Sequence, residues 1–208
     1  MTGRSVYLPP WRLDLTIREG VRIPLSRRAL AGDVARALSA AAAPAPASLG
    51  LILSDDAELA SLNRLHMGLE GPTDVLSFPL LPLGSFPRHP GQADPHVGSG
   101  PPFALPPGRR PHLGDVVISV ERAAAQARLG RGGQTGRRRG SVADEVRLLA
   151  VHGTLHVCGW DHARRAEAAA MRALERRLLA VRSGWTAHAP SGDNRGGAAL
   201  GKGERCNG

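Results

Sequence analysis

Residues 152–162, with the sequence HGTLHVCGWDH, contain three histidines at a spacing that constrains how this part of the chain can fold. On an α-helix, His152 and His156 lie four positions apart, so their side chains project from one face with Cβ atoms about 5–6 Å apart. Gly159 is suited to end that helix in a left-handed conformation, and the reversal that it permits lets His162 fold back toward the first two histidines. We therefore expect a helix, a tight turn and three imidazoles around one point.

Three imidazole nitrogens around one point form a ligand set for zinc, and they leave a fourth position open for water, as catalytic zinc sites do. The H-x3-H-x5-H spacing coincides with that of the extended zinc-protease motif. In those proteases the residue after the first histidine is a glutamate that acts as general base, but this chain has Gly153 there. We predict one zinc ion on His152, His156 and His162, with a metal-bound water as the reacting group.

Two neighbours of the histidines allow two interpretations each. Gly153 leaves room for either a bulky substrate group or a close helix contact, and Asp161 either orients a ligand histidine or is simply a turn residue. We expect the other histidines to be surface residues or hydrogen-bonded core residues; they are His66, His89, His96, His112 and His188.

The pattern of apolar residues predicts alternating strands and helices. Strands are expected at 11–18, 49–56, 73–80 and 113–120. Helices are expected at 25–42, 56–66, 121–130, 141–159 and 163–182. Ser54 or Asp55 can cap the second helix, in which Leu59, Leu62 and Leu65 have apolar spacing, and Ser141 with Asp144 matches a capping box for the helix of the histidines.

The length of 208 residues fits one domain, which we place at 1–182. Residues 82–112 are rich in proline and glycine, so we expect a flexible loop inserted between strands. The segment 132–139 is expected to be a mobile basic connector, and residues 183–208 a disordered tail.

Charge and cysteine content indicate the setting. A net charge of +9 favours a polyanion such as nucleic acid, although an arginine-rich composition alone gives the same value. The arginines at 109–110 and 137–139 either contact phosphates or are solvated loop charges. Cys158 and Cys206 predict no disulfide, which fits a cytoplasmic protein. No uncharged apolar run approaches the roughly 20 residues that span a bilayer, so we expect a soluble protein without a membrane partner.

Three blocks of the sequence resemble the YbeY endoribonucleases, also called rRNA maturation factors. They occur in the family's order as LNRLHMGLEGPTDVLSFP (62–79), LGDVVIS (113–119) and HGTLHVCGWDH (152–162), and with the elements between them they cover roughly residues 10–182. The resemblance implies an α+β fold with a small sheet, a zinc ion on the three histidines and cleavage of single-stranded RNA. It further implies a role in maturation of the 3′ end of small-subunit (16S) rRNA and in ribosome quality control, with a ribosomal subunit or ribosomal proteins as further partners.

Pattern and resemblance together predict an α+β fold in which a small four-stranded mixed sheet packs with helices. The zinc site is expected on a central helix and the turn after it.

The first block departs from the family at one position. Where the family usually has Tyr-Arg before the glycine, this chain has His66-Met67, so the arginine often linked to RNA cleavage is absent. Arg64 lies three residues earlier on the same expected helix and is either a substitute for it or a solvated surface residue. The departure favours an alternative function, a non-catalytic ribosome-assembly factor in which zinc holds the C-terminal helices together. A zinc peptidase is a further alternative, and Gly153 argues against it.

Overall fold

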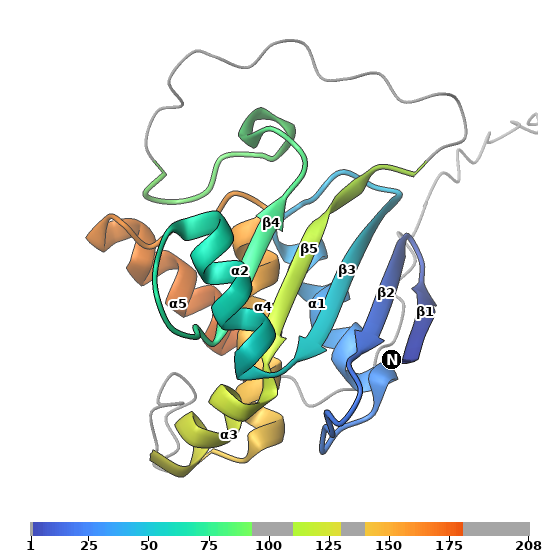
Figure 1. Ribbon diagram of the computed structural model, residues 1–208. Coiled ribbons are helices and arrows are strands. Elements are labelled where there is room, and N and C mark those ends of the chain that lie inside the picture. The colour runs from blue at the N-terminus through green and yellow to red at the C-terminus, as the bar shows by residue number, and fades with distance from the viewer. Residues whose placement is uncertain (1, 93–109, 130–139, 181–208) are drawn as a thin grey trace, which may run out of the picture.

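The computed structural model describes residues 2–92, 110–129 and 140–180, and these form one mixed β-sheet with helices on both faces (Figure 1). The strands are ordered β1-β2-β3-β5-β4. The two edge strands run antiparallel to their neighbours, whereas β2, β3 and β5 are parallel to one another. The bounds are Thr2–Leu8 for β1, Trp11–Ile17 for β2, Ala47–Ser54 for β3, Val75–Pro79 for β4 and His112–Ser119 for β5.

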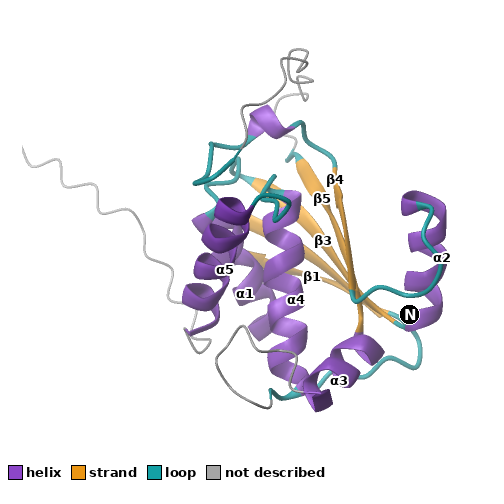
Figure 2. Cartoon of the chain, turned by 90° about the vertical axis from the view of Figure 1, so that its left-hand side faces the viewer, coloured by secondary structure: helices purple, strands orange, loops and turns teal. Residues whose placement is uncertain are grey.

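The helices form a layer on each face of the sheet (Figure 2). Three of them share one face, namely α1 (Arg27–Ala40), α4 (Val142–Val157) and α5 (Arg165–Ala180). The other face is covered by α2 (Asp56–Met67), while α3 (Val120–Leu129) continues from β5 at one end of the sheet and η1 (Leu83–Ser85) is a single 3-10 turn. The predicted α+β class is confirmed.

The sheet has one strand more than the four predicted. β1 forms an antiparallel hairpin with β2, from Thr2 opposite Ile17 to Leu8 opposite Trp11. Five of its seven residues are exposed, so β1 lacks the alternation of apolar and polar positions by which a half-buried strand is recognised. An edge strand can be held mainly by backbone hydrogen bonds to one neighbour, and these leave little trace in the side-chain pattern.

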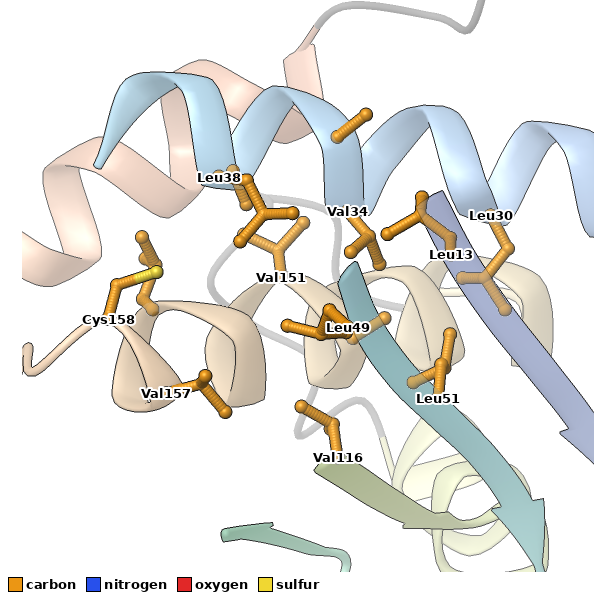
Figure 3. Packing of buried hydrophobic residues seen from close by; sticks show 14 of the residues in the cluster. Leu13, Leu30, Val34, Leu38, Leu49, Leu51, Val116, Val151, Val157 and Cys158 are labelled. Carbon is orange, nitrogen blue, oxygen red and sulfur yellow. The ribbon is translucent and has the colours of Figure 1, made fainter. Parts of the chain in front are cut away.

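The larger hydrophobic core lies between the sheet and the layer of α1 and α4 (Figure 3). Leu13, Leu49 and Leu51 of the parallel strands are at most 1% exposed, and they meet Leu38 of α1 and Val151 of α4. Each such side chain contributes about 1.5–3 kcal/mol when fully buried, so this packing fixes the position of α4 on the sheet. A smaller cluster under α2 consists of Leu59, Leu76 and Val117.

The predicted helix starts are confirmed at two helices. Asp55 caps α2 by accepting a hydrogen bond from the backbone N–H of Glu58 at 2.9 Å. Ser141 and Asp144 form the reciprocal capping box that begins α4.

One residue of α2 does not face inward as predicted. Leu65 is 75% exposed, whereas Leu59 and Asn63 are buried. Leu65 follows Leu59 by six residues and therefore points about 120° away from it around the helix axis. The buried face of α2 is narrower than the apolar spacing suggested.

The first part of the predicted loop insertion packs against the rest of the protein. Phe86 and His89 are each only 8% exposed. Gly91 has a φ of 84° and approaches the Glu167 backbone so closely that an added Cβ would lie 2.6 Å from its nitrogen. The prediction of a flexible loop is therefore wrong for residues 82–92, because this segment buries two large side chains. Residues 93–109, the basic connector 132–139 and the tail 183–208 lie outside the described residues.

Two further expectations concern the setting of the protein. Within residues 2–92, 110–129 and 140–180, no helix combines the length and hydrophobicity needed to cross a membrane. Cys158 is a free, buried thiol, and burial raises its pKa to about 12. Cys206 lies outside the described residues, so the absence of a disulfide between the two stays a prediction.

Candidate metal centre

The C-terminal half of α4 carries the first two histidines of the triad. The Nε2 atoms of His152 and His156 lie 3.1 Å apart, and the planes of the two rings are inclined by 81°. The ring centroid of His162, from the turn after α4, lies 5.7 Å from that of His152 and 5.0 Å from that of His156. One nitrogen from each ring can be chosen so that all three lie within 4.8 Å of one another. The structure thus brings the three predicted ligands together.

The turn that returns His162 to α4 is a Schellman-type helix end. Gly159 has a φ of 83° and its N–H donates to the carbonyl of His156 at 3.0 Å, while the N–H of Trp160 donates to the carbonyl of Leu155 at 3.0 Å. Trp160 is 9% exposed, so its indole anchors the turn in the core. The predicted left-handed glycine at the end of the helix is confirmed.

A buried carboxylate orients the first histidine. Glu175 of α5 is 1% exposed, and its Oε1 lies 2.7 Å from Nδ1 of His152. The Nδ1–H donates to this carboxylate, which leaves Nε2 unprotonated and able to bind a metal. Among the described residues, Oε2 of Glu175 is buried without a hydrogen-bond partner.

The second histidine is kept neutral by its surroundings. Burial and the nearby His152 and His162 together lower the pKa of His156 to about 4. A hydrogen bond to the Trp160 backbone and the charge of Asp161 oppose this shift. A neutral imidazole binds a metal without first losing a proton. His156 is therefore ready to act as a ligand at neutral pH.

The separation of the first two histidine nitrogens is close to that expected for two ligands of a tetrahedral zinc ion. Zinc–nitrogen bonds measure about 2.0–2.1 Å, so two nitrogen ligands of a tetrahedral ion are separated by about 3.3 Å. The Nε2 atoms of His152 and His156 are 3.1 Å apart, which is close to that separation. Three histidine nitrogens, one of whose rings is held by a buried carboxylate, form a donor set that can hold a divalent metal ion.

The histidines border an open pocket of about 390 Å³. Met67, residues 73–77 and Pro79 form the rest of its wall. Because Met67 lines this pocket, the position at which the family usually has an arginine lies at the site. Arg64 is exposed on α2 and is not part of the pocket wall.

Asp161 contacts the backbone of the turn more closely than it contacts an imidazole. Its Oδ1 accepts a hydrogen bond from the backbone N–H of His162 at 2.7 Å but lies 4.0 Å from Nδ1 of the same residue. Both side chains are more than half exposed. This geometry favours the interpretation of Asp161 as a turn residue.

Gly153 makes a close contact with the sheet. A Cβ added there would lie 2.5 Å from Cγ1 of Val116 and 3.1 Å from Oγ of Ser77. The hydroxyl of Ser77 also donates to the Gly153 carbonyl at 3.1 Å. Of the two interpretations of this glycine, the close helix contact is therefore the one that the structure supports. The place of the protease glutamate has no room for a side chain.

His89 of the insertion packs against the turn that carries His162, the third histidine of the triad. The ring of His89 stacks on Trp160, with centroids 4.2 Å apart and planes inclined by 11°, and its Nε2 lies 3.0 Å from the carbonyl oxygen of Gly159. Glu167 is 4% exposed; its Oε1 lies 3.4 Å from the same Nε2 and accepts a hydrogen bond from the backbone N–H of Asp161 at 3.2 Å. The insertion therefore contacts the turn that holds His162 at the candidate metal centre.

Sequence reasoning missed the two glutamates of α5. Glu167 and Glu175 fall on the same side of the helix as its buried apolar residues, of which Met171 and Leu174 are examples. A buried carboxylate is costly unless it has a partner, so an acidic residue on an apolar face was the available signal.

The expectation for the remaining histidines is confirmed where it can be checked. His66 is exposed, and His89 is a hydrogen-bonded core residue. The ring of His112 is hydrogen-bonded through Nδ1 to Ser48 at 3.0 Å and through Nε2 to Asp115 at 3.2 Å. His96 and His188 lie outside the described residues.

Comparison with known proteins agrees with these observations. A family model described as endoribonuclease YbeY matches residues 21–182. The endoribonuclease YbeY of Moorella thermoacetica is 42% identical over 149 residues, which cover 70% of this chain and 81% of that protein. The protein of the same name from Salinispora tropica is 42% identical over 134 residues, covering 64% and 73%, and that from Chelativorans sp. is 35% identical over 154 residues, covering 72% and 77%.

A solution structure of a Thermotoga maritima protein overlaps with 81% of this chain and 88% of its own length, at 17% identity and a TM-score of 0.42. The assignment is made from the sequence matches, which span the elements of the histidine site. The chain belongs to the YbeY endoribonuclease family.

Proposed function

We propose that this protein is a zinc-dependent endoribonuclease that cleaves single-stranded RNA. The observation that carries the proposal is the convergence of three histidine nitrogens within 4.8 Å at an open pocket, in a chain of this family. His152, His156 and His162 hold the ion, and the pocket beside them is the place for the scissile phosphate.

The chain's own residues prepare the site for this chemistry. A zinc ion, when bound, supplies a water whose pKa falls to about 7 and a Lewis acid for a phosphoryl oxygen. Glu175 fixes the proton of His152 on Nδ1, so that Nε2 faces the ion. The turn held by Gly159 and Trp160 returns His162 to the other two histidines.

The carboxylate beside the pocket, that of Asp74, already accepts hydrogen bonds from other parts of the protein. Asp74 accepts hydrogen bonds from the Val75 backbone at 2.9 Å and from Gln126 at 2.8 Å. We therefore assign proton transfer to the substrate, whose leaving alkoxide or phosphate oxygen takes part in it. Hydrolysis of a phosphodiester tolerates this arrangement better than hydrolysis of a peptide.

The proposal includes a cellular role. Membership in the family supports action on the 3′ end of 16S rRNA and in ribosome quality control in the cytoplasm, with the small ribosomal subunit or its proteins as partners. The net charge of +9 is consistent with an RNA partner.

Cleavage of a labelled single-stranded RNA tests the proposal. Zinc-loaded protein is compared with the His156→Ala variant and with a chelator-treated sample. Cleavage that is lost in both controls supports a metal-dependent nuclease. Cleavage that persists in both comes from a contaminant, and absence of cleavage by the zinc-loaded protein contradicts the proposal.

A second candidate is a non-catalytic ribosome-assembly factor, favoured by Met67 at the position of the family's arginine. In that case zinc stabilises the contact between α4 and α5, and removing it lowers the melting temperature without affecting any cleavage. The peptidase alternative finds no support, because the space beside Gly153 admits no glutamate. A proteolysis assay that stays negative with the zinc-loaded protein discards it.

A further inference from the structure

The exposed face of α5 carries basic residues without acidic ones. Exposed arginines occur in the helix and at the residue before it: Arg164, Arg165, Arg172, Arg176 and Arg177. The two acidic residues of α5, Glu167 and Glu175, are 4% and 1% exposed and point into the protein. No carboxylate of the helix therefore screens its arginines.

Three of these arginines form a line along the helix. Arg165, Arg172 and Arg176 are separated by seven and then four residues, so at 3.6 residues per turn their side chains project within about 40° of one another. With a rise of about 1.5 Å per residue, the line is about 16 Å long. We call these three residues the α5 stripe.

The stripe differs from several arginines elsewhere in the structure. Arg12 is 3.0 Å from Asp14, and Arg122 is 3.1 Å from Asp56, so their charges are partly compensated. Within residues 2–92, 110–129 and 140–180, no carboxylate forms an ion pair with any arginine of the stripe. No carboxylate in the described part of the chain therefore compensates these three charges.

The stripe begins next to the candidate metal centre. Arg165 follows the ligand His162 by three residues. Arg172 lies three residues before the buried Glu175, whose carboxylate contacts His152, so the stripe runs along the edge of the helix face that carries this contact. Figures 1 and 2 both show α5 at the outer side of its helical layer, and the three arginines of the stripe are exposed. A strand lying in the pocket can continue along the stripe.

We propose that the α5 stripe binds the phosphate backbone of a single-stranded RNA whose scissile bond lies at the candidate metal centre. This rests on the proposed function and extends it, because it identifies where the substrate lies outside the pocket. The guanidinium group is always charged, and its planar fork matches phosphate oxygens in pairs. Such contacts carry no sequence information, so the stripe adds affinity for any unpaired strand.

Two triple variants test the stripe. In the first, Arg165, Arg172 and Arg176 are each changed to Gln. In the matched control, the exposed Arg4, Arg22 and Arg28 are each changed to Gln, which removes the same charge from β1, the loop after β2 and the start of α1. For the binding measurements both are made in the His156→Ala background, so that binding is measured without cleavage, and for the cleavage assay both are also made with His156 intact.

Binding of a labelled single-stranded RNA is followed by fluorescence anisotropy between about 50 and 200 mM salt. Each phosphate contact contributes about 0.7 to the slope of log affinity against log salt for a single strand, so the stripe variant should lower the slope by about 2. Its affinity should fall roughly tenfold at the lower salt, equally for two RNAs of unrelated sequence. The control triple should leave the slope unchanged.

Replacing the three stripe residues by Lys keeps the charge, and this variant should retain the original slope. Melting temperatures of all variants confirm that they are folded. A stripe variant that binds RNA with the slope of the control overturns the proposal, and so does an equal loss in both triples, which reports net charge alone. A stripe variant that loses affinity for an acidic protein but keeps its affinity for RNA also overturns the proposal.

The cleavage assay separates this inference from the proposed function. Suppose that the zinc-loaded protein cleaves RNA and that the stripe triple cleaves as well as the control triple at limiting substrate. RNA binding by the stripe is then refuted, and the proposed endoribonuclease function is supported. If no form of the protein cleaves RNA but only the stripe triple loses RNA affinity, RNA binding by the stripe is supported and the proposed endoribonuclease function is refuted.

Discussion

The contact between Glu175 and His152 gives the most direct test of the candidate metal centre. Oε1 of Glu175 lies 2.7 Å from Nδ1 of His152, and the carboxylate is 1% exposed. Such a short bond from an imidazole to a buried carboxylate fixes the ring and increases the basicity of the metal-binding nitrogen. We predict that Glu175 determines zinc affinity although it does not touch the ion.

The expected magnitude follows from the two functions of the carboxylate. Loss of an outer partner of a ligand histidine typically costs about 10–100-fold in metal affinity, or about 1.4–2.7 kcal/mol. Glu175→Gln retains an oxygen that can accept from Nδ1 but loses the charge, so we expect a decrease of about tenfold. Glu175→Ala removes the acceptor, and the decrease should approach about 100-fold.

Competition with a fluorescent zinc chelator measures these affinities, and circular dichroism verifies that each metal-free variant is folded. Glu145→Gln is a matched control, because Glu145 is 4% exposed on α4 and none of its hydrogen bonds involves a ligand histidine. Its zinc affinity should equal that of the unsubstituted protein. Folded Glu175 variants that bind zinc as tightly as the control would refute the reasoning.

Three further predictions concern the same region. The pKa of His156 is about 4 in the folded protein against 6.5 for the free side chain, so the unfolded chain binds one more proton between these values. The free energy of unfolding of the metal-free protein should therefore fall as the pH falls from about 6.5 to 4, by up to about 3 kcal/mol; urea titrations measure it, and His156→Ala should abolish this part of the dependence. Gly153→Ala places a Cβ 2.5 Å from Val116 and should cost about 1–3 kcal/mol in thermal unfolding experiments, and an unchanged melting temperature would contradict the packing. His89→Ala removes the stack on Trp160 and should weaken zinc binding by roughly tenfold in the chelator assay, whereas an effect on stability alone would show that the insertion does not position the turn.

The sequence by itself determined that the three histidines come together, and it determined most of the secondary structure. The spacing of His152 and His156 and the glycine at 159 act within one helix and one turn, where local geometry decides which side chains meet. The same holds for the cap at Asp55 and the capping box at Ser141, because each involves residues at most three positions apart. Such features can be predicted because they do not depend on the rest of the fold.

Only the tertiary structure decided which distant residues support the site. Glu175 meets His152 from 23 residues away, and His89 meets Gly159 from 70 residues away, because packing brings α5 and the insertion against the end of α4. The edge strand β1 likewise depends on backbone pairing with β2, which its exposed side chains do not encode. Contacts between residues far apart in sequence come from the burial of whole helix and strand faces, and a single chain's pattern does not specify which faces meet.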